Sequence, residues 1–254
     1  MIAPEDPPGF VVRTEVQKAA WDNGFRLERG VEPGGWLHYA STTARGEIWI
    51  AGIGPHGPWL LSIDHAGVAA EFASLPPQQV TGPGLAAFGF DTLTALHAAL
   101  DRVYKLGVSL PDAPLGRFRA QTAQLPQTTE AERLVVQRIG QGIFRAALMD
   151  YWGGCCRSLA SRIPPCCAPR TSVPWAECDD AQRLDVHNGL LLSALLDAAF
   201  DTGLVSFTDD GTVLVSPELT AAARTALDIE SAQCSPISCT ACRVTSLGTA
   251  ARRC

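Results

Sequence analysis

The sequence predicts an α+β protein with two domains, on three observations. Strand-like segments separated by glycine and proline lie close together between Gly35 and Asp64. Apolar residues recur at helical spacing after Asp91 and again after Thr129. A chain of 254 residues with 46% hydrophobic content is also long enough for two cores. We therefore expect an N-terminal domain built from a small antiparallel sheet with helices, followed by a second α+β domain.

The N-terminal sheet is predicted from three short apolar runs at residues 36–39, 48–51 and 59–63. A helix is expected near residues 11–22. A second helix begins at Asp91, which is a suitable N-cap. Its apolar face is formed by Leu93, Leu96, Leu100 and Val103.

A glycine motif at residues 52–57, Gly-Ile-Gly-Pro-His-Gly, matches the dinucleotide-binding fingerprint. The residues that follow it predict a strand, whereas a pyrophosphate site needs a helix N-terminus at that point. The sequence therefore favours a glycine-rich hairpin. His56 and His65 are accordingly expected at a turn and at a strand end rather than as ligands.

The second domain follows residues 111–128, whose prolines and polar residues predict a linker or an exposed crossing. Thr129 and Glu132 then form a capping-box pattern that opens a helix, and Gly153-Gly154 ends it. The residues expected on its buried side are Leu134, Val135, Ile139, Ile143, Ala147 and Leu148.

Three further elements are expected toward the C-terminus. Asn188 is a candidate N-cap for an apolar core helix through Ala199. The turn residues Asp209-Asp210-Gly211 predict a hairpin between residues 204–207 and 213–215. A last helix is expected to begin at Ser216-Pro217-Glu218, with the proline at its first position.

The net charge of −6 and the pI of about 5.3 exclude a broad basic surface of the kind that drives nonspecific DNA binding. A DNA-binding role would need a local patch. In residues 101–170 the basic residues outnumber the acidic ones: Arg102, Lys105, Arg117, Arg119, Arg133, Arg138, Arg145, Arg157, Arg162 and Arg170. A solvated helix face remains the alternative for each of these side chains.

The cysteines and the first residues bear on the compartment. Nine cysteines, an odd number, argue against a disulfide framework when no secretion signal is seen. Cys239-x-x-Cys242 with the pairs at 155–156 and 166–167 offers an alternative four-thiolate zinc site, although adjacent cysteines point apart on most backbones. No signal peptide or membrane span is expected, and the prediction is a cytoplasmic protein.

Several segments within residues 138–219 share one resemblance. They are Arg138-x-Gly140-Gln141-x-x-Phe144-Arg145-x-x-Leu148, Trp152-x-Gly154-x-Cys156, Val173-Pro174-Trp175, Asn188-Gly189-Leu190-Leu191-Leu192 and Phe200-Asp201. Together they resemble the HNH, or ββα-metal, endonuclease family. The resemblance implies a C-terminal HNH-type ββα-metal domain that cleaves DNA with one divalent cation, Mg²⁺ or Mn²⁺, and a histidine that activates water. The expected limits are residues 1–125 for an N-terminal domain of unknown role, 126–235 for the nuclease-like domain, and 236–254 for an irregular tail.

The resemblance also implies roles for individual residues. Asn188 falls on the family's asparagine, which fixes the loop that positions the histidine; a plain helix cap is the alternative. Asp197 falls where the family usually has a metal-binding histidine, and a surface aspartate is the alternative. His187 is a candidate metal ligand or substitute general base. The family's first histidine falls on Thr171, which cannot act as a base at neutral pH.

Residues 157–172, which surround Thr171, contain mainly Arg, Ser, Pro, Ala and Cys with no period of 2 or 3.6. They predict an irregular or poorly ordered segment. One hypothesis is that a GC-rich gene is read out of frame here. A shifted reading of one codon choice gives PLTGITDPALLRASHI, with a histidine in place of Thr171. Residues 237–254 have a similar composition.

The predicted function is therefore an HNH-type endonuclease that hydrolyses DNA phosphodiester bonds with a divalent metal and is impaired as written. A noncatalytic DNA-binding or target-recognition protein is the alternative, because the histidine is missing. A zinc-stabilised interaction module is the third possibility, and it would use the cysteines.

Overall fold

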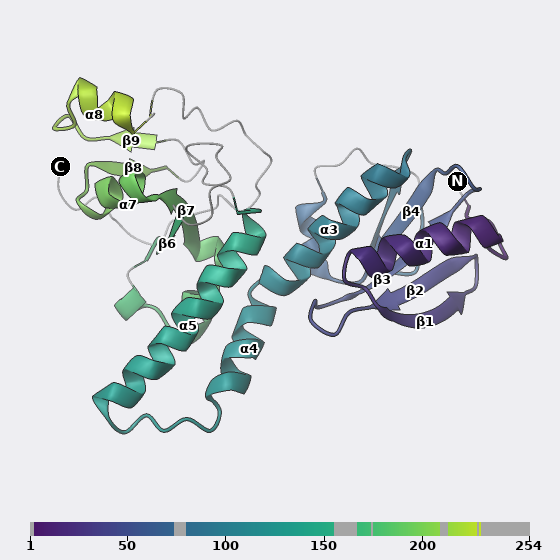
Figure 1. Ribbon diagram of the computed structural model, residues 1–254, viewed down its shortest axis with the longest axis horizontal. Helices are drawn as coiled ribbons and strands as arrows, with labels where there is room; N and C mark the ends of the chain where they lie inside the picture. The colour runs from purple at the N-terminus through teal and green to yellow at the C-terminus, as the bar shows by residue number, and fades with distance from the viewer. Residues whose placement is uncertain are drawn as a thin grey trace. The chain divides into compact units, whose positions relative to one another are not determined.

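The computed structural model describes residues 3–73, 80–154, 167–173, 175–208, 213–227 and 229. The chain divides into two compact units, residues 1–113 and 114–254, and each unit is considered by itself (Figure 1). Within the described ranges no helix has both the length and the apolar character needed to cross a bilayer. The expected tail at 236–254 lies outside these ranges. The predicted domain boundaries at residues 125 and 235 remain a prediction.

The N-terminal unit contains a five-stranded antiparallel sheet in sequential order. Its strands are β1 (Leu27–Glu32), β2 (Trp36–Ala40), β3 (Glu47–Gly52), β4 (Trp59–Ile63) and β5 (Ala86–Phe90). The expected antiparallel sheet is thus confirmed. Because Gly52 pairs with Trp59 across β3 and β4, the glycine motif forms a hairpin and no phosphate-binding turn.

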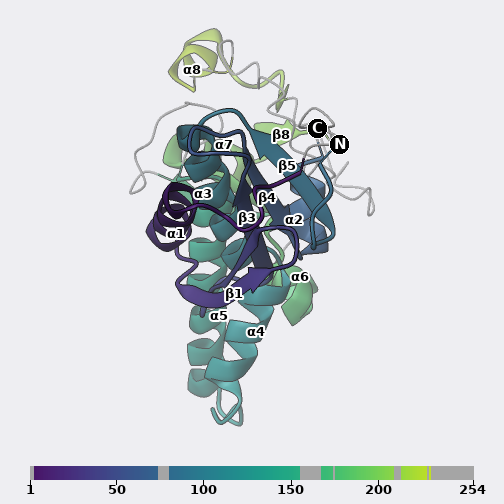
Figure 2. The same cartoon turned by 90° about the vertical axis from the view of Figure 1, so that its right-hand side faces the viewer.

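Two helices cover one face of this sheet, α1 (Phe10–Asp22) and α3 (Leu93–Ser109), with the short α2 (Ala66–Glu71) beside α3 (Figures 1 and 2). Both long helices were expected, and α3 was predicted from the spacing of its apolar residues. The cap of α3 is Thr92 and not Asp91, because the Thr92 hydroxyl accepts a hydrogen bond from the Ala95 amide. Core residues such as Ile50, Leu61 and Leu100 have no exposed surface.

The C-terminal unit begins within a helix where a linker was expected. Helix α4 (Asp112–Thr122) occupies most of residues 111–128, so the linker prediction was wrong. Pro114 lies in the first helical turn, where a missing amide costs nothing. Phe118, only 7% exposed, gives this helix a buried contact that the scattered polar residues concealed.

Helix α5 (Glu130–Tyr151) has the predicted capping box, formed by Thr129 and Glu132. It ends before Gly153 and Gly154, which both have positive φ angles, as expected. The prediction for its buried side was wrong at Leu134 and Val135, which are 50% and 51% exposed. Burial begins only at Gly140 and continues through Ile143 and Leu148, because the first turns of α5 lie beyond the hairpin that the later turns cover.

That hairpin pairs β6 (Cys167–Thr171) with β7 (Gly189–Ser193), and α7 (Ala194–Asp201) packs on both strands. Its long connection contains the turn η2 (Trp175–Glu177), the helix α6 (Asp180–Leu184) and the turn η3 (Val186–Asn188). The helix expected from Asn188 is therefore wrong for its first part. Leu190, Leu191 and Leu192 form a strand, and Ser193 caps α7, since a short apolar run fits either structure and the pairing with β6 decides.

The expected irregularity of residues 157–172 is also wrong for residues 167–171, which form β6. Backbone pairing needs no side-chain period, and a strand with one partner tolerates Pro169. Residues 157–166 and the side chain of Cys167 lie outside the described part of the chain. The frameshift hypothesis therefore stays a hypothesis.

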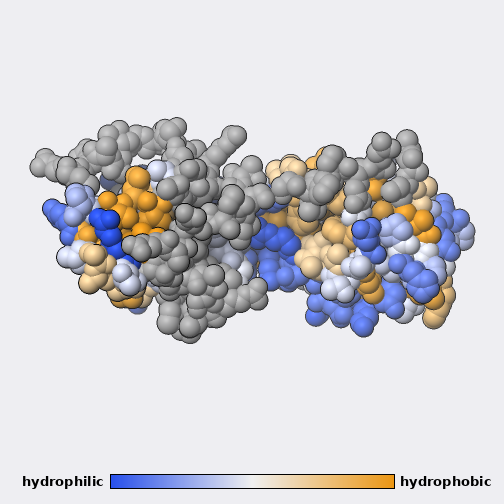
Figure 3. Space-filling view, turned by 90° about the horizontal axis from the view of Figure 1, so that it is seen from above, coloured by the Kyte–Doolittle hydropathy of each residue, from blue (hydrophilic) through white to orange (hydrophobic). Residues whose placement is uncertain are grey.

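The end of the unit consists of β8 (Val205–Phe207), β9 (Val213–Val215) and α8 (Ala221–Ala226). The two strands pair as predicted, although the turn residues 209–212 lie outside the described ranges. The helix expected at Ser216 was wrong: Ser216, Pro217 and Glu218 form a turn, and Thr220 caps α8. Leu195 and Leu214 are 62% and 50% exposed here, and Figure 3 shows hydrophobic surface on this unit.

Candidate active site

Asn188 links the backbone after β6 to helix α6 by hydrogen bonds. Its side-chain oxygen accepts a hydrogen bond from the Val173 amide at 3.2 Å. Its side-chain amide donates to the Gln182 carbonyl oxygen at 3.0 Å and approaches the Cys178 sulfur at 3.6 Å. The Asn188 carbonyl in turn accepts from the Ser172 amide at 2.9 Å. Asn188 thus fixes the backbone directly after Thr171, and it does so from a turn and not as a helix cap.

The next residue, Gly189, is in close contact with α5. A Cβ atom at this position would lie 2.7 Å from side-chain atoms of both Phe144 and Leu148. Atoms this close would have to move, so only a glycine fits the observed approach of β7 to α5. The beginning of β7, and Asn188 with it, is therefore held directly against the helix.

Thr171 is the last residue of β6 and lies opposite Gly189 in the strand register. It is half-buried. Residues alternate between the faces of a strand, so the side chains of Thr171 and Arg170 extend to opposite faces of the hairpin. A hydroxyl here can form hydrogen bonds but cannot take a proton from water at neutral pH.

Arg170 holds both acidic residues of α7. Its Nε donates to Asp197 Oδ1 at 2.8 Å, and its Nη2 donates to Asp197 Oδ2 at 3.2 Å and also to Asp201. The hydrogen bonds that Arg170 donates to Asp197 raise the pKa of Arg170 above its ordinary value. The Asp197 side chain is 20% exposed, so this bidentate pair is partly shielded from water. The expected metal carboxylate is thus neutralised by an arginine, and the structure does not bring it together with Thr171.

His187 lies in η3 with its ring packed edge-on against Tyr151 of α5, at a centroid distance of 5.6 Å. Its Nδ1 atom is buried, and no hydrogen-bond partner for it occurs among the residues that the structure describes. The ring therefore lies against α5, whereas the side chain of the adjacent Asn188 extends toward Val173 and Gln182. The two candidate residues have different surroundings.

Within the described ranges no three His, Cys, Asp or Glu side chains are grouped as metal ligands. Cys178 is a free, buried cysteine in those ranges. Cys178 was not part of the alternative zinc site, whose cysteines lie outside these ranges except for the backbone of Cys167. Asp197 and Asp201 form an acidic pair with spacing i, i+4 on one helix face, a signal in the sequence that could have indicated this cluster.

Basic side chains line the solvent side of α5, where Arg133, Arg138 and Arg145 are exposed. They belong to the basic stretch expected from the sequence. Sequence reasoning missed Arg170 as the partner of Asp197 and Gln182 as the partner of Asn188. No signal could have identified Gln182, because its contribution is a backbone carbonyl.

Comparison with known families gives one match, to the HNH endonuclease family, over residues 143–208. A search of curated proteins found no match. The matched residues begin in the buried half of α5 and end after β8, and they include the hairpin β6–β7, the Asn188 contacts and α7. The C-terminal half of this chain therefore contains a domain of the HNH endonuclease family, which is a nuclease-type domain.

Proposed function

We propose that the C-terminal unit is an endonuclease domain for DNA phosphodiester bonds that uses one divalent cation, Mg²⁺ or Mn²⁺, and that this chain cleaves DNA very slowly. The observation that supports the proposal best is the position of Asn188. Its side-chain oxygen accepts from the Val173 amide and its carbonyl accepts from the Ser172 amide, so it holds the backbone directly after Thr171, the position that the resemblance aligns with the family's histidine. Its side-chain amide anchors it to the Gln182 carbonyl of α6.

The missing histidine explains the low expected rate. Hydrolysis needs a deprotonated water in line with the leaving oxygen and a cation that offsets the charge developing on the phosphate. A positioned base contributes about 10²- to 10⁴-fold to the rate, and a threonine hydroxyl supplies none of it at neutral pH. His187 is the substitute base or metal ligand in this proposal, and it would have to leave its contact with Tyr151 to act.

Asp197 remains the proposed metal carboxylate, with Arg170 as its competitor. A carboxylate suits Mg²⁺ or Mn²⁺ well. In this chain, however, both oxygens of Asp197 already accept hydrogen bonds from Arg170. A cation would have to displace the guanidinium, so two adjacent residues of β6, Arg170 and Thr171, both oppose catalysis.

The test compares plasmid cleavage by the chain as it stands with cleavage by Thr171→His and by the double variant Arg170→Ser/Thr171→His. We expect no visible cleavage by the first and metal-dependent, EDTA-sensitive cleavage by Thr171→His. Faster cleavage by the double variant would support a metal at Asp197, whereas equal cleavage by the two variants would argue for a metal on the other face of the hairpin, to which the side chain at position 171 extends. Adding Asn188→Ala should abolish the gain. A version with the whole shifted segment at 157–172 extends the test, and sequencing the gene across that segment tests the frameshift hypothesis.

Equal, EDTA-sensitive cleavage by the original chain and by Thr171→His would contradict the role given to position 171. His187→Ala in the original chain would then show whether His187 is the base. Loss of that cleavage would move the catalytic centre to η3. Unchanged cleavage would exclude His187.

A second candidate function is noncatalytic recognition of DNA. The pairing of Arg170 with Asp197 favours it, because an ion pair in place of a metal site is compatible with binding and not with hydrolysis. DNA binding without cleavage by any of the variants would support this function. One zinc per purified chain would instead support the zinc-stabilised module.

A further inference from the structure

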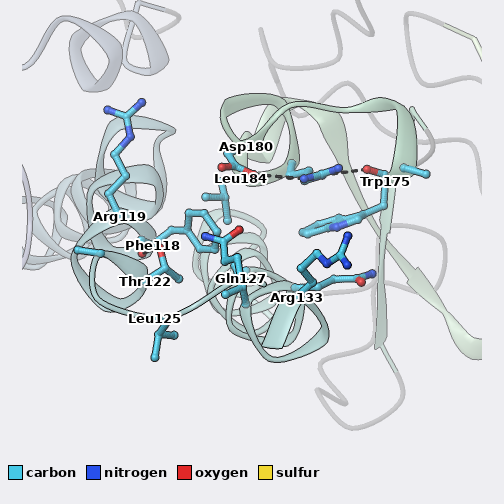
Figure 4. A pocket seen from close by; sticks show the side chains of 15 residues that line it. Phe118, Arg119, Thr122, Leu125, Gln127, Arg133, Trp175, Asp180 and Leu184 are labelled. Atoms are coloured by element: carbon cyan, nitrogen blue, oxygen red, sulfur yellow. Dashed lines mark hydrogen bonds and ion pairs between the residues drawn. The ribbon is translucent and has the colours of Figure 1, made fainter. Parts of the chain in front are cut away.

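A pocket of about 840 Å³ lies in the C-terminal unit between α4, α5, η2 and α6 (Figure 4). None of the roles discussed above uses it. Its volume is within the range of about 300–1,000 Å³ that is usual for small-molecule sites. One residue separates Gln182, whose carbonyl accepts from Asn188, from the lining residue Leu184. The pocket therefore adjoins helix α6, to which the side chain of Asn188 is hydrogen-bonded.

Aromatic side chains line two sides of the pocket. Phe118 of α4 is buried, and Trp175 of η2 is half-buried and extends toward the hollow from the opposite side in Figure 4. The Trp175 ring has a fixed position, because Phe144 packs on it edge-on at 6.1 Å and its carbonyl accepts from Arg183 Nε at 2.9 Å. The Arg183 guanidinium lies over this ring, 5.8 Å from its centroid, so a planar group can stack only on the part of the half-buried indole that Arg183 leaves open.

Gly140 of α5 keeps the space between the two rings open. A Cβ atom there would lie 3.4 Å from Phe118 and 3.5 Å from Trp175. Both distances are ordinary contacts, so an alanine would fit without strain and would fill the floor of the pocket. Gly142, two residues later, is exposed, and a Cβ atom there would meet no other atom within 4 Å.

The charge of the lining is positive, although the chain as a whole is acidic. Three arginines, Arg119, Arg133 and Arg183, line the pocket with one acidic residue, Asp180. Asp180 already pairs with Arg183 at 3.2 Å. Neither Arg119 nor Arg133 has an ion-pair partner among the described side chains. Both residues are exposed, so their guanidinium groups can meet an anion.

We propose that this pocket binds one unstacked nucleotide of a DNA strand, with the base against Trp175 and Phe118 and the phosphate at Arg133 and Arg119. The inference rests on the proposed function, because it takes DNA as the ligand. A base can enter such a pocket only when it is out of the duplex stack, so single-stranded DNA should bind better than duplex. Stacking on an aromatic platform and pairing of phosphate with arginine are the two contacts that this class of ligand needs.

The test measures the affinity of the full chain for a fluorescein-labelled single-stranded oligonucleotide by fluorescence anisotropy. Gly140→Ala should weaken binding by about 5- to 100-fold, the range that the loss of one stacked base gives. Gly142→Ala is the matched control and should leave affinity unchanged. Both variants replace glycine by a better helix former, and equal thermal denaturation midpoints for the two would show that a loss of affinity confined to Gly140→Ala does not come from unfolding. Arg133→Gln should reduce the salt dependence by about 0.7 in slope, the value for one phosphate on a single strand.

The proposal is overturned if Gly140→Ala and Gly142→Ala bind alike, or if the original chain does not bind the oligonucleotide. It is also overturned if a polyglutamate peptide displaces the oligonucleotide equally well, since the pocket would then accept any acidic chain. Its failure can be told from that of the proposed function. Cleavage by Thr171→His without a Gly140 effect on binding removes only the pocket, whereas a Gly140 effect without cleavage by any variant removes only the nuclease.

Discussion

The five-stranded sheet of the N-terminal unit and the hairpin β6–β7 of the C-terminal unit are stabilised differently. In the sheet, the strands supply their own core: every residue of β4 is buried, and Leu60 and Leu61 have no exposed surface. In β6, the described side chains at 168–171 are all only half-buried. That strand is held by pairing with β7, by the Asn188 contacts and by the ion pair of Arg170. A strand that contributes little to a core can therefore change its side chains, including a catalytic one, and keep its place.

The largest effect is expected where the sheet depends on burial. Leu61→Ala removes a side chain with no exposed surface and should lower the free energy of unfolding by about 2–5 kcal/mol, measured by urea denaturation. Val31→Ala on β1, where the side chain is 44% exposed, is the matched control and should cost less than about 0.5 kcal/mol. Similar losses in the two variants would show that the sheet does not depend on its apolar core.

A smaller effect is expected at Asn188, where the hairpin depends on polar contacts. Asn188→Ala leaves the Val173 amide and the Gln182 carbonyl without these partners and should cost about 1–3 kcal/mol. Faster amide hydrogen exchange at Val173 would localise the change. Asn188→Asp keeps the acceptor for Val173 and loses the donor to Gln182, so exchange at Val173 should remain slow. Unchanged exchange in Asn188→Ala would mean that Asn188 does not fix the loop.

The sheet should also lose stability in alkaline solution through Tyr39. Burial raises the pKa of Tyr39 to about 12, and its hydroxyl has no hydrogen-bond partner among the described residues. A raised pKa stabilises the folded state fully below the unfolded value, near 10, and this stability is lost as pH rises toward 12. The free energy of unfolding, measured by urea denaturation, should therefore fall over this window by an amount on the order of 1–2 kcal/mol. Tyr39→Phe should show a shallower fall, and equal slopes would contradict the assignment.

The smallest effect on stability is expected at Arg170. Its side chain is 32% exposed, so Arg170→Ala should cost only about 1 kcal/mol or less, with a dependence on salt. The same change frees Asp197 and Asp201 and should increase the affinity of the unit for Mn²⁺, measured by isothermal titration calorimetry. Arg183→Ala, which breaks the pair with Asp180, is the control and should leave Mn²⁺ binding unchanged. No gain for Arg170→Ala would argue against a metal at Asp197.

The sequence predicted the elements whose side chains form a regular apolar pattern. The strands β2, β3 and β4 were found at the three predicted apolar runs, α3 at the predicted helical spacing, and the capping box of α5 at Thr129 and Glu132. The outer strands β1 and β5 were not predicted. It failed where tertiary contacts decide. Strand β6 forms because β7 offers a partner, and the run Leu190–Leu192 is extended for the same reason, so neither could be predicted from local residues. Asn188 was predicted to be a site residue from the family resemblance, but its partners, the Val173 amide and the Gln182 carbonyl, are backbone groups that no residue pattern indicates.

The close fit of Gly189 against Phe144 and Leu148 has a consequence for any attempt to transplant this domain. The hairpin cannot be transferred to another protein without α5, because β7, the strand that follows Asn188, packs closely against this helix. A minimal portable fragment must start at the capping box of α5, at Thr129, even though the family match starts only at residue 143. A graft that begins at β6 would lose the helix against which Asn188 and Gly189 are aligned.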